Sequence, residues 1–220
     1  MRPDYVRLPV SGNRSNDKVA AWVPLTLFEA LQTADAPVDD DWEEVSAEET
    51  ARRLGRSKTV ALQIERYRRL ARSNREVSGV EVLGVLRLVA RRSDAALVFA
   101  EAGRRAGRYL ARSRGAWELI RRLVPFRAVR DAMGWKLACN AAAARLGVQL
   151  SKEGKTVIAS VEHSVAARAT PDGSACRFYG SAVAELLRNV TSFDGALVHE
   201  TCVARGDHTC RWRSVTGSGE

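Results

Sequence analysis

The stretch Cys202-Val-Ala-Arg-Gly-Asp-His-Thr-Cys210 decides how the last third of this chain is interpreted. Its two cysteines bracket a short polar loop, and a third cysteine, Cys176, lies upstream at the start of a predicted helix. His199 stands just before the loop. Thiolate and imidazole groups are ligands that Zn²⁺ prefers, and four of them complete its tetrahedral coordination. The spacing therefore predicts a zinc site formed by Cys176, His199, Cys202 and Cys210.

Glu200 is the alternative fourth ligand. Side chains alternate along a strand, so strict alternation over residues 196–202 would place Glu200, and not His199, on the face of Cys202. A bulge or the end of the strand would remove this conflict. Histidine is a good zinc ligand, and we expect His199 to be the fourth one. The competing interpretation, that the cysteines are buried apolar residues, fits poorly with the polar Gly-Asp-His loop between two of them.

Length and composition limit the class of protein. The 220 residues suffice for one core, or for a core with a small appended module, and 45% hydrophobic with 28% charged residues is typical of a soluble globular protein. The sequence has neither the long apolar run of a membrane helix nor the apolar segment of a signal peptide near Met1. We therefore expect a cytoplasmic protein, in which clustered cysteines bind metal more often than they form disulfides.

Positive charge is concentrated in the middle of the chain. Residues 46–135 hold 21 basic and 9 acidic side chains, a difference of +12, whereas the whole chain carries +9. Nearly all of these basic residues are arginines, which suit phosphate groups. The segment is therefore a candidate for binding nucleic acid or another anionic surface. Solvated helix faces rich in arginine are the alternative.

Residues 46–72 have the pattern of a helix-turn-helix. Ser46-Ala-Glu-Glu49 is a capping box that opens a first helix, Gly55 ends it, and a basic second helix is predicted over Lys58–Arg72.

In a DNA-binding motif of this kind, Arg56, Lys58 and Arg66 would contact phosphates or bases. Arg56 departs from the pattern, since an apolar residue usually follows the turn glycine. A plain helical hairpin is the alternative. In either case the motif would belong to an N-terminal module over residues 1–75.

The other expected elements give a mixed α/β (α+β) fold in which helices pack on a small antiparallel sheet. Helices are expected at 24–31, 77–89, 95–112, 117–123, 129–146 and 176–189, and strands at 18–23, 156–162, 196–202 and 210–214. Gly103 and Gly107 lie four residues apart on one face of their helix, where they permit close approach of a neighbouring helix.

Four short stretches carry a resemblance to a known family: Cys176-Arg-Phe-Tyr-Gly180, Val198-His-Glu-Thr-Cys202, Ala204-Arg-Gly206 and Cys210-Arg-Trp212. Over about residues 80–215 the chain resembles the 4-vinyl reductase domain family. That family shares its α/β fold with subunits of the TRAPP tethering complex, and its sensory members hold zinc with three cysteines and an acidic residue. Here His199 stands where the acidic ligand is usual.

The resemblance implies a cavity for a small hydrophobic or aromatic ligand in a domain at residues 80–215. The aromatic candidates to line it are Trp117, Phe126, Trp135, Phe178 and Tyr179. The fold relatives also suggest a homodimer, formed through the helix that carries Gly103 and Gly107.

Two functions follow as expectations. The first is a zinc-containing ligand sensor that regulates transcription by binding DNA. The second is an accessory protein that binds or delivers a hydrophobic molecule such as a chlorophyll intermediate, with Arg104, Arg105 and Arg108 pairing with its propionates. An enzyme is not expected, because four protein ligands leave the zinc no open position and the sequence shows no cofactor fingerprint.

Overall fold

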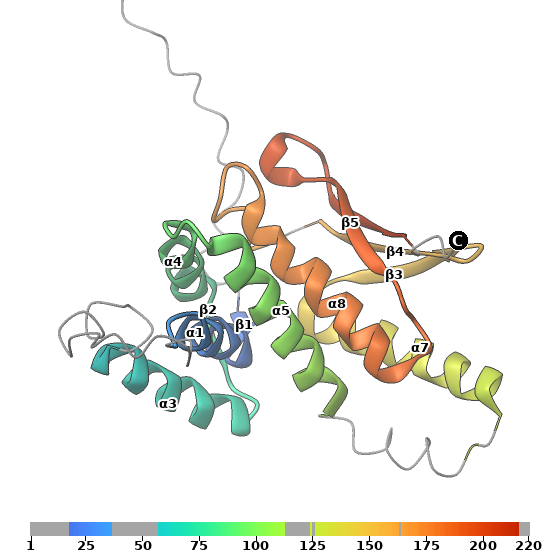
Figure 1. Cartoon of the computed structure of the whole chain (residues 1–220), viewed down its shortest axis with the longest axis horizontal. Helices are drawn as coiled ribbons and strands as arrows, with labels where there is room; N and C mark the ends of the chain where they lie inside the picture. Colours follow the sequence, from blue (N-terminus) through green and yellow to red (C-terminus); the bar gives the residue numbers. More distant parts are fainter. Residues whose placement is uncertain (1–17, 37–56, 113–123, 125, 163, 216–220) are drawn as a thin grey trace, which may run out of the picture.

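The computed structural model describes residues 18–36, 57–112, 124, 126–162 and 164–215, and these form six helices and two antiparallel sheets. Two helices, α5 (Ala95–Arg112) and α8 (Arg177–Val190), lie side by side at the centre of the molecule (Figure 1). The larger sheet covers α8 on one side, and the N-terminal helices lie on the other side of α5. The expected mixture of helices and a small antiparallel sheet is confirmed at this level.

The larger sheet has four strands in the order β3-β4-β6-β5. These are β3 (Gln149–Glu153), β4 (Thr156–Val161), β5 (Ala196–Thr201) and β6 (Cys210–Val215). Three of them match the predicted strands to within a residue. Strand β3 was not predicted, because its side chains are mostly exposed and polar and give no apolar alternation.

The smaller sheet pairs β1 (Lys18–Ala20) with β2 (Glu76–Ser78). The strand expected at 18–23 is therefore shorter than predicted, since helix α1 (Trp22–Ala34) already begins at Trp22. Pro24 does not start this helix but lies in its first turn. A proline is tolerated there because the first N–H groups of a helix have no intrahelical partner.

Helix α3 (Lys58–Arg72) has the bounds expected for the second helix of the helix-turn-helix pattern. Ser57 caps it by accepting a hydrogen bond from the Val60 N–H at 3.2 Å. The predicted first helix at 46–54 lies outside the described residues, so the motif stays a prediction. Helix α4 (Gly79–Ala90) follows β2, again with a serine cap at Ser78.

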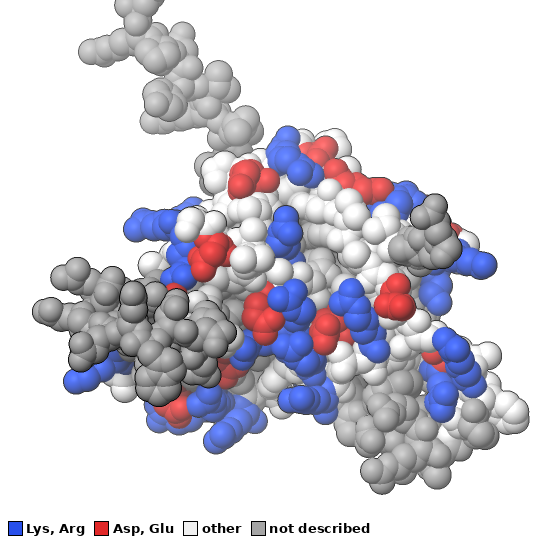
Figure 2. All heavy atoms as spheres, in the orientation of Figure 1, with Lys and Arg blue, Asp and Glu red and all other residues white. Residues whose placement is uncertain are grey.

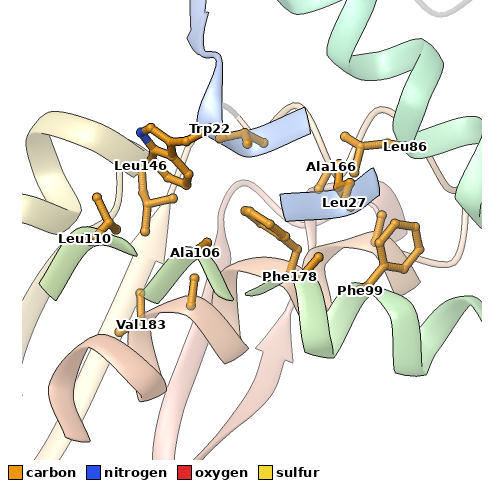
Figure 3. Close-up of a cluster of buried hydrophobic side chains, with 14 of the residues drawn as sticks. Trp22, Leu27, Leu86, Phe99, Ala106, Leu110, Leu146, Ala166, Phe178 and Val183 are labelled. Carbon is orange, nitrogen blue, oxygen red and sulfur yellow. The ribbon is translucent and has the colours of Figure 1, made fainter. Parts of the chain in front are cut away.

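One hydrophobic core joins residues on both sides of the predicted boundary at 75–80. Figure 3 shows Trp22 and Leu27 of α1 in the same cluster as Phe99 and Leu110 of α5 and Phe178 of α8. The division into two domains stays a prediction, but the described parts of both do not have separate cores.

Helices α5 and α8 approach each other closely at two glycines of α5. A Cβ atom on Gly107 would lie 2.5 Å from the Ala182 carbonyl oxygen of α8, and Gly103 is as tightly enclosed. The predicted close approach of a neighbouring helix is confirmed, and the neighbour is α8 of the same chain. Because α8 covers it, the glycine face of α5 is not free for a partner chain, and the expected homodimer stays a prediction.

Helix α7 (Arg127–Leu146) precedes β3, the first strand of the larger sheet. It ends at Gly147, which adopts the left-handed conformation at φ 67°, as expected for a glycine that ends a helix. Across the described parts of the chain, we find no helix with the length and apolar character needed to cross a membrane.

Candidate metal centre

The three clustered cysteines and one histidine meet at the end of the sheet next to α8. One ligand atom from each of Cys176, His199, Cys202 and Cys210 lies within 4.8 Å of all the others. The Sγ atoms of Cys176 and Cys202 are 3.8 Å apart, and Cys210 Sγ is 3.9 Å from each of them. All three cysteines are fully buried. The structure thus brings together the four predicted ligands into a group that could hold a metal ion.

The turn that precedes α8 positions Cys176. This cysteine ends a short 3-10 turn, Ser174–Cys176, and stands at the N-cap of the helix. Gly173 precedes this turn with φ 72°, and Asp172 stabilises it by accepting the Ser174 N–H at 3.0 Å. The N-terminus of a helix stabilises negative charge in general, but here the hydrogen bond with Cys210 and burial raise the pKa of Cys176.

The loop between β5 and β6 positions the other two cysteines. The carboxylate of Asp207 accepts a hydrogen bond from the Cys202 N–H at 2.6 Å, and Gly206 turns the chain with φ 96°. The Val203 N–H donates to the Cys210 sulfur at 3.4 Å. A loop of this kind holds two sulfurs side by side with a backbone N–H directed at one of them.

His199 reaches the cluster because β5 is irregular. The pairing of β5 with β6 shifts between His199 and Thr201, which is a β-bulge. His199 therefore lies on the same side as Cys202, while Glu200 points away and pairs with Arg213 at 2.7 Å and Arg211 at 3.6 Å. Of the two candidate fourth ligands, the structure places His199 in the cluster.

The donor set fits a soft metal ion. The Nε2 atom of His199 is buried, and no described residue gives it a hydrogen bond. The thiol of Cys176 donates toward Cys210, which holds the pKa of Cys210 well below its ordinary value and raises that of Cys176. The cluster is thus disposed to carry a thiolate, the form that binds zinc. His208, in the same loop, is exposed and lies outside the group.

Trp212 is a neighbour of the centre to which the sequence analysis gave no role. Its indole stacks on the His199 ring with centroids 4.7 Å apart and planes 12° from parallel. Tryptophan at this position was visible in the Cys210-Arg-Trp212 motif, but only the pairing of His199 with Trp212 across two strands reveals the contact.

Next to the centre lies a pocket of about 470 Å³. Phe178 and Tyr179 line it from the first turn of α8, so two of the five predicted aromatic residues face a cavity. The other lining residues come from four separate segments: Lys18, Val19, Ala20, Val23, Glu76, Ala143, Ala144, Arg145, Leu146, Gly147 and Val165. No local sequence signal links these segments, which is why they were not predicted.

The remaining predicted aromatic residues do not line this pocket. Trp135 is half-buried on α7, with the Lys152 ammonium 4.3 Å from its ring centroid. Phe126 is 71% exposed just before α7. Trp117 lies outside the described residues.

Of the three predicted DNA contacts, two can be placed. Lys58 is exposed at the start of α3, and Arg56 lies outside the described residues. Arg66 forms an ion pair with Glu81 of α4 and lies over the ring of Tyr67. Its guanidinium is therefore engaged within the chain.

The arginines of α5 are also paired. Arg104, Arg105 and Arg108 all contact Glu101, and Arg108 also contacts Glu185 of α8. Figure 2 shows the resulting mixture of basic and acidic side chains over this face. These arginines are not among the residues that line the pocket.

Comparisons with known proteins returned no match: no family model, no curated protein and no solved structure corresponds to this chain. The resemblance to the 4-vinyl reductase domain family therefore stays a hypothesis.

Proposed function

We propose that this chain is a zinc-stabilised sensor domain that binds a small hydrophobic or aromatic molecule. The supporting observation is that the metal cluster and the pocket share the first turn of α8. Cys176 belongs to the cluster, and Phe178 and Tyr179, two and three residues further on, line the pocket. Zinc would supply a cross-link between this turn and the β5–β6 hairpin, and so hold one wall of the pocket in place. With four protein ligands it would have a structural and not a catalytic role.

The pocket is large enough for a small ligand, and its lining mixes apolar side chains with the charged Lys18, Glu76 and Arg145. Its volume lies within the range of about 300–1,000 Å³ typical of small-molecule sites. Val19, Val23 and Val165 face it together with the two aromatic residues of α8.

Metal content tests the first half of this proposal. We expect mass spectrometry to find about one zinc ion per chain in the wild-type protein purified without a tag. The matched pair His199→Ala and Glu200→Ala separates the two candidate ligands: zinc is lost or much weakened in the first and retained in the second. Folded wild-type protein without metal would contradict the proposal.

Ligand binding tests the second half. The methyl resonances of Val19, Val23 and Val165 would be followed by NMR while a set of small aromatic compounds, such as phenols and alkylbenzenes, is added. Ala144→Trp would fill the pocket from an exposed position on α7, and Ala132→Trp is the control on the same helix away from it. We expect shifts that Ala144→Trp abolishes and Ala132→Trp retains. Shifts that survive in both variants would place the ligand elsewhere.

DNA binding by this sensor is a second proposal, and the surface of α3 favours it. Lys58, Arg69 and Arg72 are exposed on this helix against one exposed acidic residue, Glu65, while Arg66 is paired with Glu81 of α4. Ligand occupancy would then bias DNA affinity, provided that the ligand binds the two states unequally. We expect a mobility shift with genomic DNA fragments at low salt, weakened by Lys58→Ala and Arg69→Ala but not by Lys155→Ala on the β3–β4 turn. No shift even at low salt would contradict DNA binding.

The alternative is an accessory protein that delivers a tetrapyrrole intermediate. The ion pairs of Arg104, Arg105 and Arg108 within the chain weaken the role expected for them with propionates. A shift of the Soret absorption band when a chlorophyllide is added would favour this alternative over a sensor of small aromatic compounds.

A further inference from the structure

We propose that Trp212 is a positioning residue for the metal centre: its indole fixes the plane of the His199 imidazole so that the ring meets the three cysteine sulfurs. The inference rests on the proposed zinc site and adds to it a determinant of metal affinity that is not itself a ligand.

The first observation is the ring contact. His199 and Trp212 are direct cross-strand partners in β5 and β6, and their rings lie nearly parallel with centroids 4.7 Å apart. Aromatic rings stacked in this way attract each other beyond the burial of their surface. Trp212 is 1% exposed, so its ring has no solvent space into which to move.

The second observation is what His199 lacks. A metal-binding histidine is ordinarily oriented by a hydrogen bond from its second ring nitrogen to a carboxylate or a carbonyl. Among the described residues, His199 has no such bond, and its Nε2 atom has no hydrogen-bond partner at all. Apart from its contact with the Cys210 sulfur, the indole surface is the contact that restrains rotation of the imidazole.

The third observation is how the indole itself is held. A Cβ atom on Gly180 would lie 2.9 Å from the Cδ1 and Nε1 atoms of Trp212, so the indole packs directly on the backbone of α8. Tyr179 also contacts the indole, and the centroids of the two rings are 6.3 Å apart.

Gly180 also links the packing of the Trp212 indole to a metal ligand, Cys176. It follows Cys176 by four residues, which places the two on the same face of the helix. The start of α8 thus supplies the Cys176 sulfur to the cluster. At Gly180 the same turn leaves the space in which the Trp212 indole, the ring that orients His199, packs. Cys176 and the imidazole are held at a fixed separation, with the indole as the spacer between α8 and β5.

Metal affinity and the ligand-field spectrum test the role of Trp212. Zinc affinity would be measured by competition with a chromophoric chelator, and the visible d–d bands of the Co²⁺-loaded protein would report the coordination geometry. We expect Trp212→Leu to weaken zinc binding about 10- to 100-fold, as for other groups that orient metal ligands, and to change the Co²⁺ bands. Trp212→Phe keeps an aromatic face and should restore most of the affinity. Trp135→Leu, which removes a half-buried tryptophan from α7, is the matched control.

A double-mutant cycle separates positioning from a general effect on folding. If Trp212 acts through the imidazole, Trp212→Leu should have little further effect on metal affinity once His199→Ala has removed that ring. An equal loss in both backgrounds would mean that Trp212 serves only the core, and would overturn the proposal. So would a folded Trp212→Leu variant with the wild-type affinity and Co²⁺ spectrum. Wild-type protein that binds neither metal would instead overturn the zinc site itself, and this inference with it.

Discussion

Gly103 in α5 packs directly against the backbone of Phe178 in α8: a Cβ atom at Gly103 would lie 2.3 Å from the Phe178 carbonyl oxygen. That carbonyl belongs to the turn of α8 that carries Cys176 at its start and faces the pocket with Phe178. The close approach of two central helices and the position of the candidate metal centre therefore depend on the same contact.

Adding a methyl group at this contact should loosen the α5–α8 pair. Gly103→Ala and Gly107→Ala each place a Cβ atom within 2.5 Å of a carbonyl oxygen of α8, and backbone cannot move aside as a flexible side chain can. We expect each substitution to lower the free energy of unfolding by about 1–3 kcal/mol, measured by urea denaturation.

Gly84→Ala is the matched control for these two substitutions. Gly84 also lies inside a helix, but a Cβ atom there would meet nothing within 4 Å. Alanine favours a helix over glycine by about 0.5–1 kcal/mol, so this variant should be slightly more stable than wild type. Equal behaviour of all three variants would contradict the tight packing of α5 on α8.

Gly173 is expected to affect metal binding at the candidate centre. Gly173 has φ 72°, and a Cβ atom there would lie 2.5 Å from the Cys202 sulfur. Gly154 has a similar φ of 62° but open space around it. Both alanine variants should lose about 1 kcal/mol of stability to left-handed strain. Only Gly173→Ala should also weaken zinc binding in a chelator competition. A weakening common to both would mean that strain alone is responsible.

Thermal unfolding should respond to zinc and not to magnesium. The cluster offers sulfur and nitrogen, whereas Mg²⁺ requires oxygen ligands. Zinc at about 100 times its dissociation constant would add about 2.7 kcal/mol of stability, and a chelator would remove it. Cys176→Ser should lose most of this response. Equal stabilisation of the wild-type protein by both ions would indicate binding outside the cluster.

The contact of Glu81 with Arg66 and Tyr67 should make stability depend on pH. The hydrogen bond from Arg66 holds the pKa of Glu81 below its ordinary value of 4.5, and the Tyr67 hydroxyl donates to the same carboxylate at 2.6 Å. A carboxyl with a lowered pKa stabilises the fold above its ordinary pKa, and this stability is lost as the pH falls through the lowered value.

Glu81→Gln should therefore be less stable than wild type at pH 7 by up to about 1 kcal/mol, since the pair is partly exposed to solvent. In urea denaturation the difference should shrink well below pH 4.5, where the wild-type carboxyl also becomes neutral. Glu65→Gln, which breaks a more exposed ion pair within α3, should change little at either pH. A difference independent of pH would show that the charge of Glu81 is not what stabilises the fold.

Helices and strands with a local signal, such as apolar periodicity or a helix-ending glycine, were predicted from the sequence. The apolar spacing of residues 95–112 and the glycine at 147 gave the bounds of α5 and the end of α7, because helix period and helix-ending residues are local properties. The polar strand β3 carries no such signal and was missed.

The spacing of Cys176, Cys202 and Cys210 is fixed along the chain, so it already indicates which residues are chemically fit to bind a soft metal ion. It left the fourth position open between His199 and Glu200. Tertiary structure decided that question through a one-residue shift in the pairing of β5 with β6, which turns His199 inward. It also decided the stacking on Trp212 and the segments that line the pocket. Contacts of this kind join residues far apart in the chain, and the register between strands depends on packing that no local pattern encodes.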